Sequence, residues 1–398
     1  MLPHDPIRQV SFIQQTLSQN KRPIAFLVGA GCPLSIRVVT GDGEEQTNLP
    51  LIQDVAGLTR IIHERLTSGD TNSPSDWDKL VKTAREDGAN CDNIEHLLSR
   101  VRNFRNVAGV GEVRGLRSAE LEAIDTSICE IISTEVNKSL PSIDSPYHDL
   151  AIWTRSVTRK RPVHLFTTNY DLLLEQALEE SNSPYFDGFV GSRNAFFDLG
   201  AVEDEQSLPG RWTRVWKIHG SLNWRLDEHR TVTRSTYLAP EQPYLIYPSH
   251  LKYDQSRKMP YLAMLDRLKA FLLSPTPVLI TCGYSFADEH INEVICSSLG
   301  SNPTAHVFGL LHGSIEQPSY ELAQNCARST PNLSLLAKDK AIIGRTPATW
   351  RQIEANDASL TSDALTITED GTSFNLGDFA VLGRLLRSLA STEEPNET

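Results

Sequence analysis

Short apolar runs recur along the chain, and polar or glycine-rich residues and then a helical pattern follow most of them. The run IAFLVG at residues 24–29 predicts a buried strand, because it is continuously apolar and ends at glycine. Further strands are predicted at PVHLFTTN, RVWKIHG, PYLIYP, PVLITCG and AHVFGL. Apolar residues at helical spacing predict helices at 5–19, 171–180, 261–273, 288–299 and 374–390. This alternation predicts an α/β, Rossmann-like fold, in which helices cover both faces of a mostly parallel sheet.

The segment from about residue 51 to 147 has a different pattern, because its apolar residues recur almost only at helical spacing. We expect it to form a helical insertion in a single domain that spans residues 1–398. Residues from about 311 to 398 would form a C-terminal extension of that domain. The polar, turn-rich segment at 37–48 is expected to be a loop.

The composition is that of a folded, acidic protein. Among 398 residues, 39% are hydrophobic and 22% are charged, and the formal net charge is -12. This charge argues against direct nucleic-acid binding, which requires a basic face. The N-terminal residues resemble no secretory signal, and the longest apolar runs are too short to span a bilayer. We therefore expect no membrane attachment and a cytoplasmic location.

The six cysteines form no CxxC pair, so their spacing supports neither a zinc ribbon nor a thioredoxin-type redox site. No metal is expected. Cys32 lies in a glycine loop and could act as a nucleophile, but no histidine motif near it supplies a base. A small buried side chain is the better interpretation of this cysteine.

Two glycine-containing motifs follow predicted strands. In VGAGCPLS, the residues Gly29, Ala30 and Gly31 form a turn that lets backbone N–H groups approach a pyrophosphate. The third glycine of the dinucleotide-binding motif is missing, however, and an ordinary tight turn also explains these residues. In GYSFADEHIN, Gly283 and Ser285 could contact a phosphate or a ribose at a strand end, or the motif is only a turn followed by a helix that Asp288 caps.

Two further motifs place polar side chains at strand ends. In FTTNYDLLLEQAL, Thr168 and Asp171 fit a capping box, although the carboxyl end of a parallel strand is also where open α/β sheets bind ligands. In VWKIHGSLNW, a predicted strand delivers His219, and Gly220 makes the turn after it. A histidine in such a place is more often structural than catalytic, so these residues alone leave both interpretations open.

Taken in order, GAG, TTNYD, KIHGS and GYSFADEHIN resemble the motifs of the sirtuin-like NAD-binding family, and in particular its bacterial branch without the zinc module. The runs LIYPSHLKY and GYSFADEHIN resemble sirtuin-like NAD hydrolases of anti-phage defence systems, including those paired with a HerA-type ATPase. The resemblance covers roughly residues 24–310. It implies that the single domain binds NAD.

The resemblance also implies roles for individual residues. His219 would be the catalytic histidine, and Asn169 would act beside the nicotinamide ribose. The residues implied to bind NAD are Gly29, Ala30, Gly31, Ser35, Thr168, Asp171, Gly220, Gly283, Tyr284, Ser285 and Asp288.

Two departures from the deacetylases of this family bear on the reaction. The four zinc cysteines are absent between the histidine motif and Cys282, and CPLSIRVVTG replaces the run G-I-P-D-F-R. We therefore expect an NAD hydrolase that needs no metal, takes NAD as its substrate and releases nicotinamide and ADP-ribose. ADP-ribosyl transfer, deacylation or a non-catalytic NAD sensor are the alternatives. The resemblance implies control through a homo-oligomer or an ATPase partner.

Overall fold

The computed structural model describes residues 2–40, 47–68, 74–141, 144–156, 159–226, 231–235, 260–352, 363–368 and 371–390. Within these ranges, the largest sheet has nine strands in the spatial order β17-β16-β15-β14-β13-β1-β6-β10-β7. In chain order these strands are β1 (Ile24–Val28), β6 (His164–Thr167), β7 (Tyr185–Phe186), β10 (Thr213–Lys217), β13 (Val278–Cys282), β14 (His306–Leu310), β15 (Leu333–Leu336), β16 (Lys340–Ile343) and β17 (Thr346–Thr349).

The central strands are parallel, and their carboxyl ends are level with one another. All pairs from β7 to β15 are parallel, whereas β16 and β17 are added in antiparallel orientation. The register aligns Val28 of β1 with Thr167 of β6 and with Cys282 of β13, and it aligns Thr167 with Lys217 of β10. The mostly parallel α/β sheet is therefore confirmed, and the segments that follow these strands emerge at the same edge.

Helices cover both faces of this sheet, as the sequence predicted. Alternate residues of β1 pack into different apolar clusters on the two faces of the sheet: Phe26 belongs to the first cluster and Leu27 to the second. The first cluster takes in α1 (Pro6–Ser18), α6 (Pro146–Ser156), α7 (Leu173–Glu180) and α13 (Phe379–Ala390). The second takes in α8 (Leu199–Glu203), α10 (Tyr261–Leu272), α11 (Glu289–Ser301) and α12 (Glu321–Ser329).

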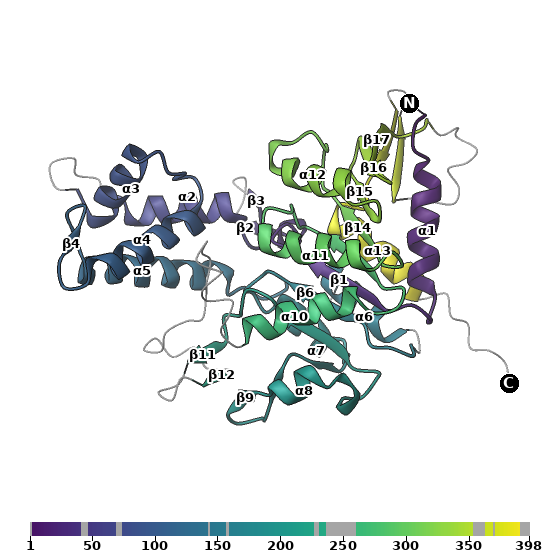
Figure 1. Ribbon diagram of the computed structural model, residues 1–398, viewed down its shortest axis with the longest axis horizontal. Coiled ribbons are helices and arrows are strands. Elements are labelled where there is room, and N and C mark those ends of the chain that lie inside the picture. Colours follow the sequence, from purple (N-terminus) through teal and green to yellow (C-terminus); the bar gives the residue numbers. More distant parts are fainter. Residues whose placement is uncertain are drawn as a thin grey trace.

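Helices also make up most of the segment between β3 and α6. The helices α2 (Val55–Leu66), α3 (Asp76–Glu86), α4 (Ile94–Ala108) and α5 (Ser118–Val136) pack on one another and extend to one side of the sheet (Figure 1). We call them the helical module. Its buried residues, among them Leu97 and Ile128, continue the first apolar cluster. A short hairpin of β4 (Glu112–Val113) and β5 (Leu116–Arg117) joins α4 to α5.

Smaller elements complete the described chain. They are β2 (Arg37–Thr40), β3 (Thr47–Pro50), β8 (Phe189–Val190), β9 (Ala195–Phe197), β11 (Trp224–Leu226), β12 (Val232–Arg234), β18 (Leu365–Thr368), β19 (Gly371–Phe374) and the 3₁₀ turns η1 (Pro33–Ser35), η3 (Glu205–Ser207) and η4 (Pro318–Tyr320). Strands β2 and β3 form an antiparallel hairpin, so the expectation of a loop at 37–48 was wrong. Backbone pairing between the two arms holds this hairpin, and the polar composition of the segment concealed it.

Some predicted boundaries also differ from the observed ones. The last helix begins at Phe379 rather than at residue 374, because 371–374 pairs as the second strand of a hairpin. The helix predicted from residue 171 begins at Leu173. The predicted strand PYLIYP and the run LIYPSHLKY lie outside the described residues.

Candidate active site

The segments that follow β1, β6, β10 and β13 meet around a cavity of about 350 Å³ at the carboxyl edge of the sheet. Strand β1 lies between β6 and β13, and later strands are added outward in both directions, so the cavity lies where the strand order reverses. The predicted site residues that line it are Ala30, Thr168, Asn169, Asp171, His219, Gly283, Tyr284, Ser285 and Asp288. Aligned parallel strands thus bring together motifs that lie far apart in the sequence.

His219 contacts a carboxylate from another strand end. Its Nε2 lies 3.0 Å from Oδ2 of Asp288, and the two side chains are 12% and 9% exposed. The other carboxylate oxygen, Oδ1, accepts the backbone N–H groups of His290 and Ile291 at 3.0 and 3.3 Å. Asp288 therefore caps α11, as predicted, and binds the histidine at the same time.

Asn169 is held from two sides, yet it keeps one unused polar atom. Its backbone N–H donates to Oγ1 of Thr167 (3.0 Å), and its Nδ2 donates to the carbonyl of Gly29 (3.2 Å). Its Oδ1 is buried and has no hydrogen-bond partner among the described residues. Because buried polar atoms are nearly always paired, this oxygen of a cavity-lining residue is a candidate to accept a donor from a ligand.

The capping-box interpretation of the FTTNYD motif was wrong. Helix α7 begins at Leu173, and its N-cap residue, Leu172, makes no side-chain capping hydrogen bond among the described residues. Asp171 instead accepts the backbone N–H of Leu173 at 3.1 Å. Thr168 is consequently not used by the helix, and it lines the cavity.

A buried lysine connects the end of β10 with the polar residues that follow β6. Lys217 is 2% exposed, and its Nζ donates to the carbonyl of Asp171 and to Oε1 of Glu175, the latter at 3.1 Å. Burial raises the pKa of Asp171 to about 6, against the opposing effect of the Lys217 charge. The lysine that ends β10 thus holds the Asn169 loop beside the strand that delivers His219.

The glycine loop after β1 packs against the loop after β13. The N–H groups of Gly29 and Gly31 donate to the carbonyls of Cys282 and Gly283, both at 2.9 Å. A Cβ on Gly29 would lie 2.3 Å from the Gly283 oxygen, so only glycine allows this approach. Gly29 and Gly31 do not line the cavity, whereas Ala30 between them does.

Two other predicted residues also lie off the cavity wall. Ser35 ends a 3₁₀ turn, and its hydroxyl donates to the Cys32 carbonyl at 2.8 Å. Gly220 turns the chain after His219 with a φ of 95°, a left-handed conformation that favours glycine.

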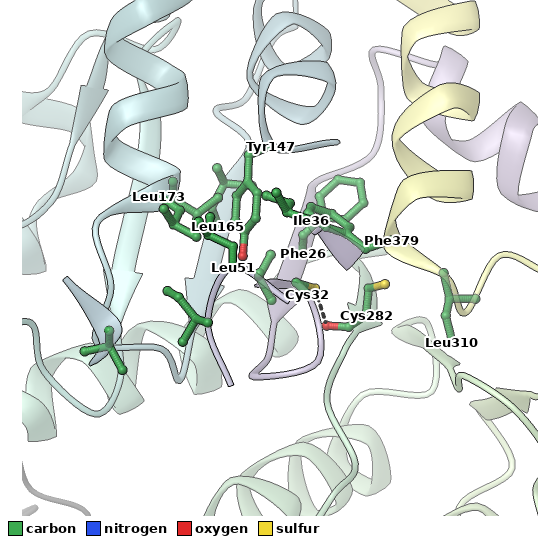
Figure 2. Packing of buried hydrophobic residues seen from close by; sticks show 14 of the residues in the cluster. Phe26, Cys32, Ile36, Leu51, Tyr147, Leu165, Leu173, Cys282, Leu310 and Phe379 are labelled. Atoms are coloured by element: carbon green, nitrogen blue, oxygen red, sulfur yellow. Dashed lines mark hydrogen bonds between the residues drawn. The ribbon is translucent and has the colours of Figure 1, made fainter. Parts of the chain in front are cut away.

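Cys32 is completely buried, and its Sγ donates to the Cys282 carbonyl at 3.1 Å (Figure 2). Burial raises the pKa of its thiol well above the ordinary value. The interpretation of Cys32 as a small buried residue is confirmed.

Comparison with known proteins finds a family match for the central segment of the chain. Residues 163–330 match the family model described as the SIR2-like domain. This segment resembles the SIR2-like family. It contains Asn169, His219 and Asp288, and it makes up less than half of the chain. No curated protein matches the chain.

Solved Sir2 structures show a distant likeness. A Sir2 homologue mutant in complex with ADP-ribose is 14% identical, with 78% of this chain and 87% of that chain covered and a TM-score of 0.34. A Sir2 homologue–NAD complex is 14% identical, with 82% of this chain and 87% of that chain covered and a TM-score of 0.33.

The wall opposite the SIR2-like segment comes from the helical module and was not predicted. Asn93 caps α4 by accepting the N–H groups of Glu95 and His96, at 2.8 and 3.4 Å, and all three residues line the cavity. Apolar residues of the 51–58 region and of α5 complete this wall, and His290 of α11 lies at the cavity as well. The sequence showed an Asn that could cap a helix. It gave no sign that this helix end faces the strand ends.

Within the described ranges, no group of three or more His, Cys, Asp or Glu side chains is placed to hold a metal ion. No described helix is long and apolar enough to cross a membrane.

Proposed function

We propose that this pocket hydrolyses the nicotinamide–ribose bond of NAD. The observation that carries the proposal is the pairing of His219 with Asp288 at a cavity that Asn169 also lines, a residue whose Oδ1 has no hydrogen-bond partner in the described part of the chain. Three further features support it: the SIR2-like match, the location at the carboxyl edge of a parallel sheet, and a cavity volume in the range of small-molecule sites.

The chemistry requires little beyond positioning and proton transfer. The bond between C1′ of the ribose and the ring nitrogen breaks, and its electron pair neutralises the positive charge of nicotinamide. A water oxygen then bonds to C1′, and the proton that the water loses passes to His219 and on to solvent. A histidine suits this transfer because its ordinary pKa lies near neutrality.

Asn169 would hold a reacting hydroxyl or the attacking water. Its Oδ1 accepts a hydrogen bond, and contacts on both sides of the residue fix its orientation. Such positioning lowers the barrier because the reactants lose their freedom of motion on binding rather than in the reaction step. Thr168, Gly283, Tyr284 and Ser285 would contact the remaining parts of NAD.

The wider role is proposed on the resemblance of the motifs. An NAD hydrolase depletes a metabolite that its own cell needs, so its activity has to be controlled. We propose a cytoplasmic effector of anti-phage defence, regulated through a homo-oligomer or a HerA-type ATPase partner. The helical module and the residues after 311 are candidates for those contacts.

The identity of the products tests this function. Purified protein, alone and mixed with a HerA-type ATPase, is incubated with NAD labelled in the adenine ring, and the labelled species are separated by chromatography. Free ADP-ribose in equal amount to nicotinamide is expected. Label that stays on protein would instead indicate ADP-ribosyl transfer. Bound but intact NAD in both preparations would indicate a sensor and contradict hydrolysis.

A further inference from the structure

We propose that Asp288 is the positioning residue of His219 and fixes the tautomer in which Nε2 carries the proton and Nδ1 holds the lone pair. For its role in catalysis, this inference rests on the proposed function. The assignment of the tautomer does not depend on the proposed function.

Each oxygen of the Asp288 carboxylate has a separate task. Oδ1 accepts two backbone N–H groups in the first turn of α11, which fixes the side chain at the helix end. Oδ2 is thereby directed at Nε2 of His219, 3.0 Å away. Both side chains are largely buried, so solvent weakens this contact little.

The loop that presents Asp288 is braced by a second residue of α11. Asn292 donates through Nδ2 to the Phe286 carbonyl at 2.6 Å, and its Oδ1 accepts the Tyr284 hydroxyl at 3.0 Å. Phe286 has a φ of 60°, an uncommon conformation for a residue with a side chain, and it is fully buried. The position of Asp288 is therefore set by the loop as well as by the helix.

Hydrogen-bond chemistry then assigns the two ring nitrogens. The cap bonds and the helix N-terminus favour the ionised carboxylate, whose oxygens only accept. The nitrogen that faces Oδ2 must therefore be a donor. A neutral imidazole has one N–H, so in this tautomer the lone pair lies on Nδ1, which would be the nitrogen that takes the proton in the proposed hydrolysis. The imidazolium formed in this step is stabilised by the adjacent Asp288 charge.

Other ionisable groups from four segments line this cavity and belong to the electrostatic surroundings of His219. They are Tyr170 and Asp171 after β6, Tyr284 after β13, Glu289 and His290 of α11, and Glu95 and His96 of α4.

Asp288→Asn tests the assignment with little change of shape. The amide keeps an oxygen for the helix cap but presents N–H groups to His219, which should force the proton onto Nδ1. The ring ¹⁵N shifts of His219, measured in ¹⁵N-histidine-labelled protein and assigned with His219→Gln, report the tautomer directly. We expect the Nε2–H form in the wild type and the Nδ1–H form in Asp288→Asn.

Asp198→Asn is the matched control. Asp198 also caps a helix, because its Oδ1 accepts the Ala201 N–H at 3.1 Å, but it does not line the cavity. This control should keep the wild-type tautomer and rate. Thermal unfolding of both variants confirms that they remain folded.

The kinetic arm measures nicotinamide release and its pH profile. Asp288→Asn should lower kcat by about 10²- to 10⁴-fold, the contribution of a well-placed base, with a smaller change in KM. An Nδ1–H tautomer in the wild type, or an unchanged tautomer and rate in Asp288→Asn, would overturn the inference. A wild-type protein with the Nε2–H tautomer but no nicotinamide release would support the assigned tautomer and would contradict the proposed hydrolase activity.

Discussion

Among single residues, Lys217 shows that contacts in the buried core hold this site in place. Its cation is buried between the Asp171 carbonyl and the Glu175 carboxylate, within two residues of His219 in the chain. Removing one member of such a group leaves a buried charge without compensation, which costs more than the pair itself contributes. The residue therefore links the stability of the fold to the geometry of the pocket.

Lys217→Met should lower the free energy of unfolding by about 3–5 kcal/mol, because Glu175 is left buried without its cation. Chemical denaturation followed by circular dichroism measures the change. Lys217→Met/Glu175→Gln should regain part of the loss. Lys79→Met, at an exposed ion pair with Asp76, should behave like the wild type. Equal stability of Lys217→Met and the wild type would contradict the bridging role.

The raised pKa of Asp171 predicts a pH dependence with a definite sign. Its folded-state pKa is about 6 against an ordinary value of 3.8, so the folded protein binds its proton more tightly than the unfolded chain. This contribution is fully present below pH 3.8 and is lost as the pH rises towards 6. Relative to Asp171→Asn, the wild type should lose on the order of 3 kcal/mol across that window. If the difference in denaturation midpoint between the wild type and Asp171→Asn stays constant from pH 3.8 to 6, the raised pKa of Asp171 is contradicted.

At the scale of elements, the strand-end loops support one another. Gly29 and Gly31 let the loop after β1 touch the loop after β13, and Asn292 of α11 braces the second of these loops. The backbone contact explains why this sheet edge needs glycine at residues that do not themselves line the cavity. The glycine pattern was visible in the sequence, but the partner loop was not.

Gly29→Ala should destabilise the protein, because the new Cβ would meet the Gly283 oxygen at 2.3 Å and the two loops would have to separate. We expect a loss of about 1–3 kcal/mol in the free energy of unfolding, with weaker ADP-ribose binding. Gly300→Ala in α11, which meets nothing within 4 Å, is the matched control and should be neutral or slightly stabilising. Similar effects of both substitutions would contradict the contact.

For the whole molecule, the cavity joins two parts of the chain that the sequence presented as separate. One wall comes from the sheet edge, and the other comes from the helical module. A ligand in the cavity would contact both walls and should hold them together.

Hydrogen exchange measures this directly. ADP-ribose is expected to slow exchange at 93–96, at the start of α4, and at 288–291, at the start of α11, because residues at both helix starts line the cavity. Exchange in α12 and in α13, which contribute no residue to the cavity wall, should not change. Protection confined to α11 would show that the helical module takes no part in binding.

Local patterns predicted the fold, and the lining of the site was predictable only in part. Continuous apolar runs revealed β1 and β13, and the order of four motifs placed Asn169, His219 and Asp288 at one sheet edge. The His219–Asp288 contact spans 69 residues, and the α4 wall depends on how the helical module packs. Such contacts depend on tertiary packing, which no window of sequence contains.

The most direct test of the central claim is the rate of nicotinamide release from NAD by the wild type and by two pocket variants. His219→Gln and Asn169→Ala should each lower the rate by about 10²-fold or more, because each removes a group that acts on the reacting atoms. His312→Gln, outside the cavity, should match the wild type. Release at the wild-type rate by both pocket variants would contradict the account.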